Sequence, residues 1–156
     1  MTAEHQGMIR VALASDGSPD ALEAAAFIAD RLSPSAISCT VLTVVERNWD
    51  KGGGDHEAPV DAEKSWALPA ARRTALRLHG IPVTIRILYG DAVREVLREL
   101  RDHPSDLLVV GHRGAHGMGG RVMGSVSQAL VHYAPVPVLV IPPPPTSKAT
   151  GPASPA

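Results

Sequence analysis

Apolar positions along this chain follow two periods that alternate from one end to the other. Short runs rich in Val, Ile and Leu predict strands at 8–14, 37–45, 82–88, 106–110 and 136–142. Most of these runs are almost continuously apolar, which is typical of strands covered on both faces. Between them, apolar residues recur three and four positions apart, and this period predicts amphipathic helices.

The helix boundaries carry signals of their own. Ser18 followed by Pro19 combines a capping hydroxyl with a proline at the first helical position, which predicts a helix over 19–32. A second helical pattern covers 60–79. Pro69 interrupts it, and because an interior proline removes a hydrogen bond, we expect either a kink or a start near Pro69.

Two further helices follow the same reasoning. Gly80 is a plausible stop for the second helix, and Gly90-Asp91 leads into a third helix with apolar residues at Val93, Val96, Leu97 and Leu100. Ser125 opens a fourth helix, SVSQALVHYA. Ser125 and Gln128 also match the spacing of a capping box.

Strands that alternate with helices predict an α/β fold, here a doubly wound five-stranded parallel sheet of order 3-2-1-4-5 with helices on both faces. Ligands of such sheets bind beyond the carboxyl ends of the strands, where the strand order reverses. That point lies between the first and fourth strands. Residues 15–17 and the glycine-rich stretch 111–125 should meet there.

Composition sets the domain organisation. The 156 residues suit a single domain, placed at 8–142, with a disordered N-terminus at 1–7 and a disordered Pro-rich tail at 143–156. Residues 46–62 contain three consecutive glycines and mixed charges, which predict a mobile loop.

Charge and hydropathy exclude several classes of protein. The net charge of −1 argues against nucleic acid as the main partner. The N-terminal segment MTAEHQGMIR has no apolar stretch of the length of a signal peptide core, and no apolar run approaches the ~18 residues of a membrane span, so we expect a cytoplasmic protein. Cys39, the single cysteine, lies in an apolar run and is expected to be a buried small hydrophobe.

The glycine-rich stretch is a candidate anion site. Gly111 and Gly114 allow close approach of the backbone to a ligand, and Gly124 precedes a helix whose first N–H groups can hold a phosphate. The hydroxyls of Ser125 and Ser127 could cap this helix, bind phosphate or do both. The stretch has no lysine and does not match a P-loop.

These residues also have interpretations that involve no ligand. The stretch could be a connector without a ligand, and Asp16 could be a turn residue. His112 and His116 are four apart, but with no third ligand nearby we interpret them as solvated, like Asp55-His56-Glu57, and predict no metal site. Trp49 and Trp66 are expected to pack partly over the sheet, with a lid as the alternative. Ser125 is not in a nucleophile elbow, so no catalytic residue is predicted.

The glycine spacing G-x2-G-x9-G-S at Gly111, Gly114, Gly124 and Ser125 resembles the ATP-binding branch of the universal stress protein family. The starting segment VALASDGS, the segment GDAVREVL and the ending VPVLVIP are also similar, so the resemblance covers roughly 8–142. It implies a Rossmann-like fold related to the adenine nucleotide alpha hydrolases.

The resemblance also implies a ligand and its contacts. ATP would be bound at the switch point, with or without Mg²⁺. If Mg²⁺ is present, it would reach Asp16 through the nucleotide. Asp16 would face the ribose or cation, and the other implied contacts are Ala14 and Ser15 near the base, Val44 on the adenine, Val110, Gly111, Arg113 and Gly114 around ribose and phosphates, and Gly124, Ser125, Val126 and Ser127 at the phosphate tail.

Function follows as a set of alternatives. The resemblance implies a nucleotide-dependent regulator of the stress response that forms a homodimer through the last strand, 136–142. Pairing of two such strands would also cover an exposed apolar edge. AMP or cyclic AMP in place of ATP, slow ATP hydrolysis, and a ligand-free module that recruits proteins through the glycine-rich loop or the Pro-rich tail remain alternatives. The sequence names no protein partner.

Overall fold

The computed structural model describes residues 7–46, 60–114 and 122–144, and within 60–65 it describes the backbone alone. Strands and helices alternate along these residues as the hydrophobic pattern predicts. Their order is β1 (Ile9–Ala14), α1 (Pro19–Arg31), β2 (Ile37–Val45), α2 (Val60–Arg77), β3 (Val83–Tyr89), α3 (Ala92–Asp102), β4 (Leu107–Gly111), α4 (Ser125–Tyr133) and β5 (Val138–Ile141).

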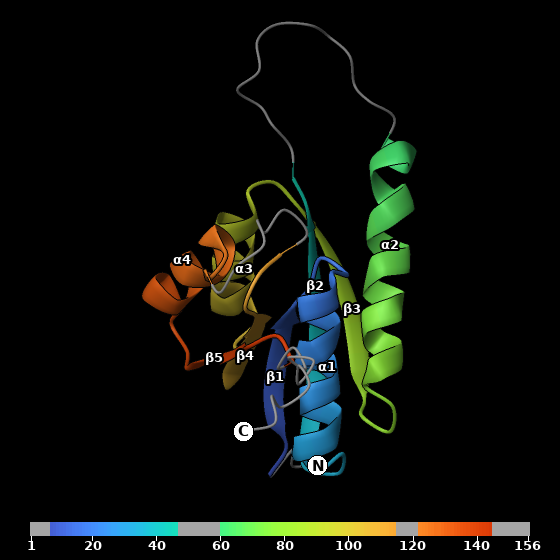
Figure 1. Cartoon of the computed structure of the whole chain (residues 1–156), viewed down its shortest axis with the longest axis vertical. Coiled ribbons are helices and arrows are strands. Elements are labelled where there is room, and N and C mark those ends of the chain that lie inside the picture. The colour runs from blue at the N-terminus through green and yellow to red at the C-terminus, as the bar shows by residue number, and fades with distance from the viewer. Residues whose placement is uncertain (1–6, 47–59, 115–121, 145–156) are drawn as a thin grey trace, which may run out of the picture.

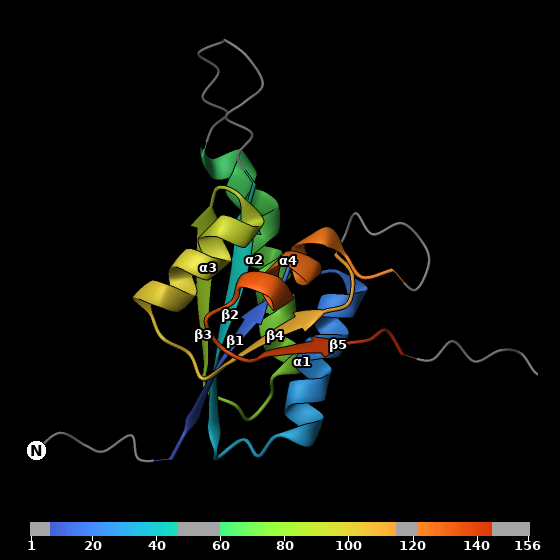
Figure 2. The same ribbon diagram turned by 90° about the vertical axis from the view of Figure 1, so that its left-hand side faces the viewer.

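The strands form one parallel sheet of order β3-β2-β1-β4-β5, which confirms the predicted fold class and strand order. Helices α1 and α2 cover one face of the sheet, and α3 and α4 cover the other (Figure 1). Figure 2 shows the molecule from the side of α3 and α4. The order reverses between β1 and β4, so the carboxyl ends of these two strands frame the expected binding point.

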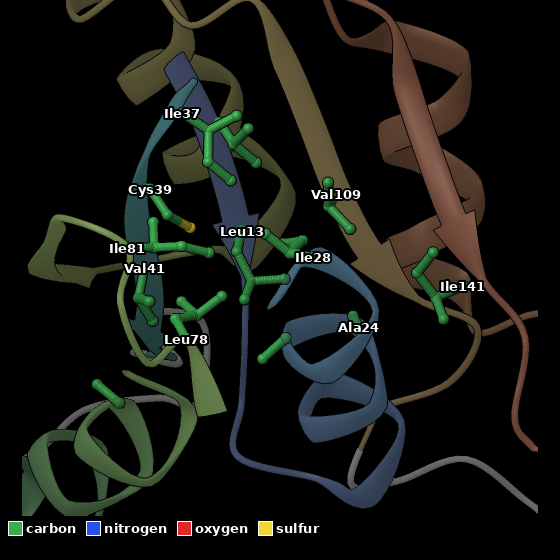
Figure 3. Packing of buried hydrophobic residues seen from close by; sticks show 13 residues of the cluster. Leu13, Ala24, Ile28, Ile37, Cys39, Val41, Leu78, Ile81, Val109 and Ile141 are labelled. Atoms are coloured by element: carbon green, nitrogen blue, oxygen red, sulfur yellow. The ribbon is translucent and has the colours of Figure 1, made fainter. Parts of the chain in front are cut away.

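Each face of the sheet has its own hydrophobic core. The core under α1 and α2 joins Leu13 and Val41 of the sheet to Ile28 of α1 and to Leu78, the residue after α2 (Figure 3). The core under α3 and α4 is smaller and contains Leu42, Val96, Leu108, Val110 and Leu130. Aliphatic residues therefore fill both layers, as the low aromatic content of 3% requires.

Cys39 belongs to the first of these cores. It is 2% exposed, and burial raises the pKa of its thiol to about 12. A thiol with this pKa is not a thiolate at neutral pH, and the thiolate is the reactive form. The prediction of a buried small hydrophobe is therefore confirmed.

The local signals were correct at α1 and partly wrong at α2. Ser18 caps α1, with its Oγ accepting from the backbone N–H of Ala21 at 3.4 Å, and Pro19 is the first helical residue. Helix α2 begins at Val60 and continues through Pro69, so a start near Pro69 is wrong. Burial of one face of α2 favours the continuous helix despite the interior proline, because tertiary packing overrides local propensity.

The amino ends of β1 and β4 are tied together at the edge opposite the switch point. The Nε–H and Nη2–H groups of Arg10 donate to the two carboxylate oxygens of Asp106 at 3.1 and 3.0 Å. This bonding holds the pKa of Asp106 below its usual value and raises the pKa of Arg10. The two strands that frame the expected site are thus held in register by side chains as well as by the ladder.

Several predictions concern residues outside the described ranges. These are most of the expected disordered ends, most of the loop 46–62 with Trp49 and Asp55-His56-Glu57, and His116. Across the helices that the structure does describe, none is both long enough and apolar enough to span a membrane.

Candidate functional site

A cavity of about 720 Å³ opens at the carboxyl ends of β1 and β4. This volume lies in the range of small-molecule sites. All the residues that the sequence proposed as ligand contacts line it: Ala14, Ser15, Asp16, Val44, Val110, Gly111, Arg113, Gly114, Gly124, Ser125, Val126 and Ser127. The structure thus brings the twelve together in one hollow.

The turn between β1 and α1 forms one wall of this cavity. The Oδ1 atom of Asp16 accepts the backbone N–H of Ser18 at 2.9 Å, and the Oγ atom of Ser15 accepts the N–H of Gly17 at 3.1 Å. Gly17 has a φ of +74°, which favours glycine. Asp16 therefore shapes the turn while it also faces the cavity, so its turn role and a contact with ligand are compatible.

Gly111, at the end of β4, is required by close packing against α1. A Cβ atom built there would lie 2.8 Å from both the carbonyl carbon and the oxygen of Asp20, and 3.1 Å from the N of Ala21. The hydroxyl of Ser127 donates to the carbonyl oxygen of Gly111 at 2.8 Å. The first turn of α1, the end of β4 and the start of α4 are consequently locked together beneath the cavity.

The glycine-rich connection between β4 and α4 is closed at its base by a backbone bond. The N–H of Gly124 donates to the carbonyl oxygen of His112 at 2.8 Å. Beside this bond, a Cβ atom on Gly114 would lie 2.8 Å from Oδ2 of Asp16, so the connection touches the β1–α1 turn directly. The glycines allow these two walls to meet.

Helix α4 does not begin with the capping box that the spacing of Ser125 and Gln128 suggests. Gly124 is the N-cap residue and makes no side-chain capping bond, while Ser125 is already the first helical residue. Since a capping side chain must come from the residue before the helix, the predicted cap by Ser125 is wrong. The first N–H groups of α4 lie at the cavity without a side-chain cap from Gly124.

Asp20 is a residue of this region that the sequence analysis missed. Its Oδ2 atom accepts the backbone N–H of Arg113 at 3.0 Å and the guanidinium Nε–H at 3.2 Å. The side chain of Asp20 is 10% exposed and that of Arg113 is 24% exposed, so the pair is largely sheltered from water. Arg113 lines the cavity, as predicted, with part of its charge committed to Asp20.

Part of the cavity wall is apolar. Leu42, Val44, Val96 and Leu130 line it from β2, α3 and α4. Trp66 of α2 lines the same cavity with 43% of its surface exposed. The sequence analysis expected Trp66 to pack partly over the sheet, with a lid as the alternative, and did not include it among the ligand contacts.

The charged groups on the cavity wall are few. Of the lining residues that the structure describes, Asp16 and Glu46 carry carboxylates and Arg113 carries a guanidinium. The described residues hold no group of three or more His, Cys, Asp or Glu that could bind a metal ion directly. His112 contributes to the site through its backbone carbonyl. The arrangement suits a ligand with an apolar ring at one end and hydrogen-bond acceptors at the other.

Comparison with known proteins assigns the fold to a family. The model of the universal stress protein family matches residues 8–142. A universal stress protein of Mycolicibacterium smegmatis is 38% identical over 65 residues, which are 41% of this chain and 50% of the relative. One of Thermus aquaticus is 35% identical over 71 residues, or 45% of this chain and 52% of the relative. The matched part of the chain thus spans about half the length of each of these relatives.

Solved structures give the same result over a larger share of the chain. The universal stress protein UspA from Lactobacillus plantarum matches with a TM-score of 0.69 and 26% identity over 88% of this chain and 99% of its own. An Arabidopsis thaliana family protein with AMP bound matches at 0.65 and 20% identity, over 86% and 91% of the two chains. A universal stress protein in complex with cAMP matches at 0.60 and 22%, over 88% and 99%. The last two matches show the shared fold. Because the family model matches residues 8–142, this chain belongs to the universal stress protein family.

Proposed function

We propose that this chain binds an adenine nucleotide in the cavity at the β1/β4 switch point. The observation that carries the proposal is the convergence of an apolar wall and the uncapped start of α4 on one hollow of about 720 Å³. An adenine ring suits the first feature, and phosphate oxygens suit the second. The AMP and cAMP complexes of two proteins with this fold support the same ligand class.

The phosphates would lie at the start of α4 and along the connection from Gly111 to Gly114. N–H groups at a helix start carry partial positive charge, which stabilises an anion. The hydroxyl of Ser125 adds a donor at the same end of the cavity, whereas Ser127 already donates its proton to Gly111. We therefore assign Ser125 to the phosphates and Ser127 to support of the loop.

The charges on the wall bear on which nucleotide is bound. Asp16 and Glu46 would repel a triphosphate more than a monophosphate, since each added phosphate increases the negative charge. We propose ATP accompanied by Mg²⁺, which would reach Asp16 through the nucleotide because the described residues offer no direct metal site. AMP or cAMP would bind without this requirement.

The site fits binding better than turnover. Phosphoryl transfer needs positioned cations and a group that orients the nucleophile. The described lining residues include one cation, Arg113, whose Nε–H is donated to Asp20, while Oδ1 of Asp16 already accepts a turn N–H. We therefore propose that any hydrolysis of ATP is slow and that nucleotide occupancy is the signal.

Calorimetric titration of the full chain with AMP, cAMP and ATP, with and without Mg²⁺, tests this function. The matched variant is Gly124→Ala, because its new methyl group would meet only ordinary contacts, the nearest at 3.4 Å, yet would stand 3.5 Å from the N of Gly114. We expect nucleotide affinity to fall about tenfold in this variant, the equivalent of one lost hydrogen bond to a charged group. Adenosine should bind wild type and variant alike.

Two results would contradict the proposal. One is the absence of binding heat for every adenine nucleotide at millimolar concentration. The other is an equal loss of adenosine and AMP affinity in Gly124→Ala, which would separate the start of α4 from the phosphates. A requirement for Mg²⁺ with ATP but not with AMP would identify the ion as part of the ATP complex.

We further propose that the chain forms a homodimer through β5. This strand is at the edge of the sheet and pairs only with β4 within the described residues. Val131 and Tyr133 of the neighbouring α4 are 48% and 67% exposed, which adds apolar surface beside the edge. Pairing of two β5 strands about a two-fold axis would cover both features.

Light scattering at micromolar protein concentration measures this assembly directly. We expect the mass of two chains for the wild type. Val140→Lys introduces a charge into β5 and should shift the mass toward one chain, while the matched change Ala26→Lys on the partly exposed surface of α1 should leave it unchanged. A wild-type mass of one chain would refute the dimer.

We propose that α4 transmits the effect of nucleotide binding to the dimer edge. This helix begins at the cavity and packs against β5. A nucleotide that fixes the start of α4 would therefore bias the surface next to β5, which gives the proposed stress-response regulator a physical route to its partners. We place this role in the cytoplasm, where a single unpaired cysteine such as Cys39 stays reduced.

A further inference from the structure

Trp66 is the aromatic side chain among the described residues that line the cavity, and it comes from a helix that the family motif does not include. The residue is 43% exposed, so part of its large apolar side chain is open to a ligand. Val44 and Val45, at the end of β2, line the same cavity from the sheet. We propose that Trp66 stacks on the adenine base and makes the site selective for nucleotides over sugar phosphates.

The position of Trp66 is fixed by two contacts lower on the same stripe of α2. Trp66, Ala70 and Thr74 are four residues apart, so they lie on one side of the helix. The Oγ1 atom of Thr74 is 2.7 Å from the Oγ atom of Ser15, and both hydroxyls are buried. Thr74 thus ties α2 to the wall that carries Asp16.

Ala70 brings the helix still closer to that wall. A Cβ atom on Gly17 would lie 2.7 Å from the Cβ of Ala70, so only a glycine opposite an alanine allows this approach. Trp66 precedes Ala70 by about one helical turn and lines the cavity. The N-terminal end of α2 lies toward the carboxyl end of β2 (Figure 1). The contacts of Ala70 and Thr74 hold the backbone of α2 against this wall, so Trp66 is presented at the cavity by a helix whose position is already set.

A base in this hollow would have aliphatic side chains on the sheet side and the indole on the α2 side. Stacking of a nucleobase on an aromatic ring contributes to affinity for any base with a π face, and it contributes nothing to a ligand without a base. The inference rests on the proposed nucleotide site but adds a distinct claim about which part of the ligand Trp66 contacts.

The test compares Trp66→Ala and Trp66→Phe with Leu76→Ala by calorimetric titration of the full chain. Leu76 is on the same helix, is 77% exposed and does not line the cavity, so it is the matched control. We expect Trp66→Ala to bind AMP about tenfold more weakly, Trp66→Phe to recover much of the loss, and Leu76→Ala to match wild type. The urea midpoint of all three should stay close to that of wild type.

Fluorescence supplies a readout that a structural role would not move. In a Trp49→Phe background, Trp66 is the remaining tryptophan, and AMP should quench its emission along a saturable curve. Ribose 5-phosphate at the same concentrations should leave the emission unchanged. Equal AMP affinity in wild type and Trp66→Ala, or no quenching by bound AMP, would overturn the stacking while leaving the nucleotide site intact. Failure of wild type to bind AMP would overturn the proposed function together with this inference.

Discussion

Gly111→Ala is expected to destabilise the protein by about 1–3 kcal/mol, the range for overpacking a filled interior. The added methyl group would stand 2.8 Å from the carbonyl carbon and oxygen of Asp20, which are backbone atoms in the first turn of α1. A helix cannot move one peptide group alone, so β4 and α1 must separate. Urea unfolding followed by circular dichroism measures the loss.

Gly124→Ala is the control for this change, because it adds the same methyl group thirteen residues further along the same connection. Its nearest neighbours would be at 3.4–3.6 Å, and the φ of −63° suits any residue. Its stability should remain within about 0.5 kcal/mol of wild type. If Gly111→Ala were equally neutral, the close contact between β4 and α1 would not exist in solution.

The pair of variants also separates two reasons for glycine in the family spacing. Gly111 is needed for packing of the protein against itself, whereas Gly124 leaves room next to the N–H groups at the start of α4. The spacing of the motif alone does not distinguish these two roles, because both positions are glycine. The two roles are distinguished by the distance from a Cβ atom on Gly111 to Asp20 and from one on Gly124 to Gly114.

Much of the fold could be predicted because it depends on patterns that are local in sequence. The strand runs and the cap at Ser18 each depend on a few neighbouring residues. Helix α2 ends at Arg77, slightly before the predicted stop, and Gly80 lies in the turn that follows, with a φ of +80°. The strand order followed from the general rules for parallel sheets. The start of α2 was uncertain because Pro69 opposes a helix locally, while burial of Ala67, Ala70 and Ala71 favours it from a distance.

The part of the candidate site that could be predicted consists of residues at or just after the carboxyl ends of the strands, and of the start of α4. Asp20 was missed, and Trp66 was not placed among the ligand contacts, for a common reason. Each reaches the cavity region from a helix, and a helix position is fixed by contacts such as Thr74 with Ser15 that no spacing reveals. The capping box at Ser125 failed because a shift of one residue in the helix start changes which side chain can cap it.

Asp20→Ala should destabilise the protein by about 1.5–3 kcal/mol, the range for hydrogen bonds that involve a charged group. Oδ2 of Asp20 accepts both the backbone N–H and the Nε–H of Arg113, and neither side chain is well exposed to water that could replace the acceptor. The carboxylate also lies in the first turn of α1, where negative charge is favourable. Thermal and urea unfolding of the purified variant measure the loss.

Asp20→Asn separates the acceptor from the charge. Its amide oxygen can still accept from the backbone of Arg113, so the variant should lose less stability than Asp20→Ala. Asp30→Ala is the matched control, because Asp30 is exposed on the same helix and should have little effect. Equal losses for the two Asp20 variants would show that the charge alone matters.

The same variants test how Arg113 is used at the cavity. If Asp20 positions the segment from Arg113 to Gly114 for phosphates, Asp20→Ala should weaken AMP binding while adenosine binding is retained. If Asp20 instead restrains a guanidinium that would otherwise reach the phosphates, its removal should strengthen AMP binding. We expect the first result, because Asp20 holds the backbone N–H of Arg113 as well as its side chain, and an unheld backbone cannot keep its N–H groups aimed at an anion.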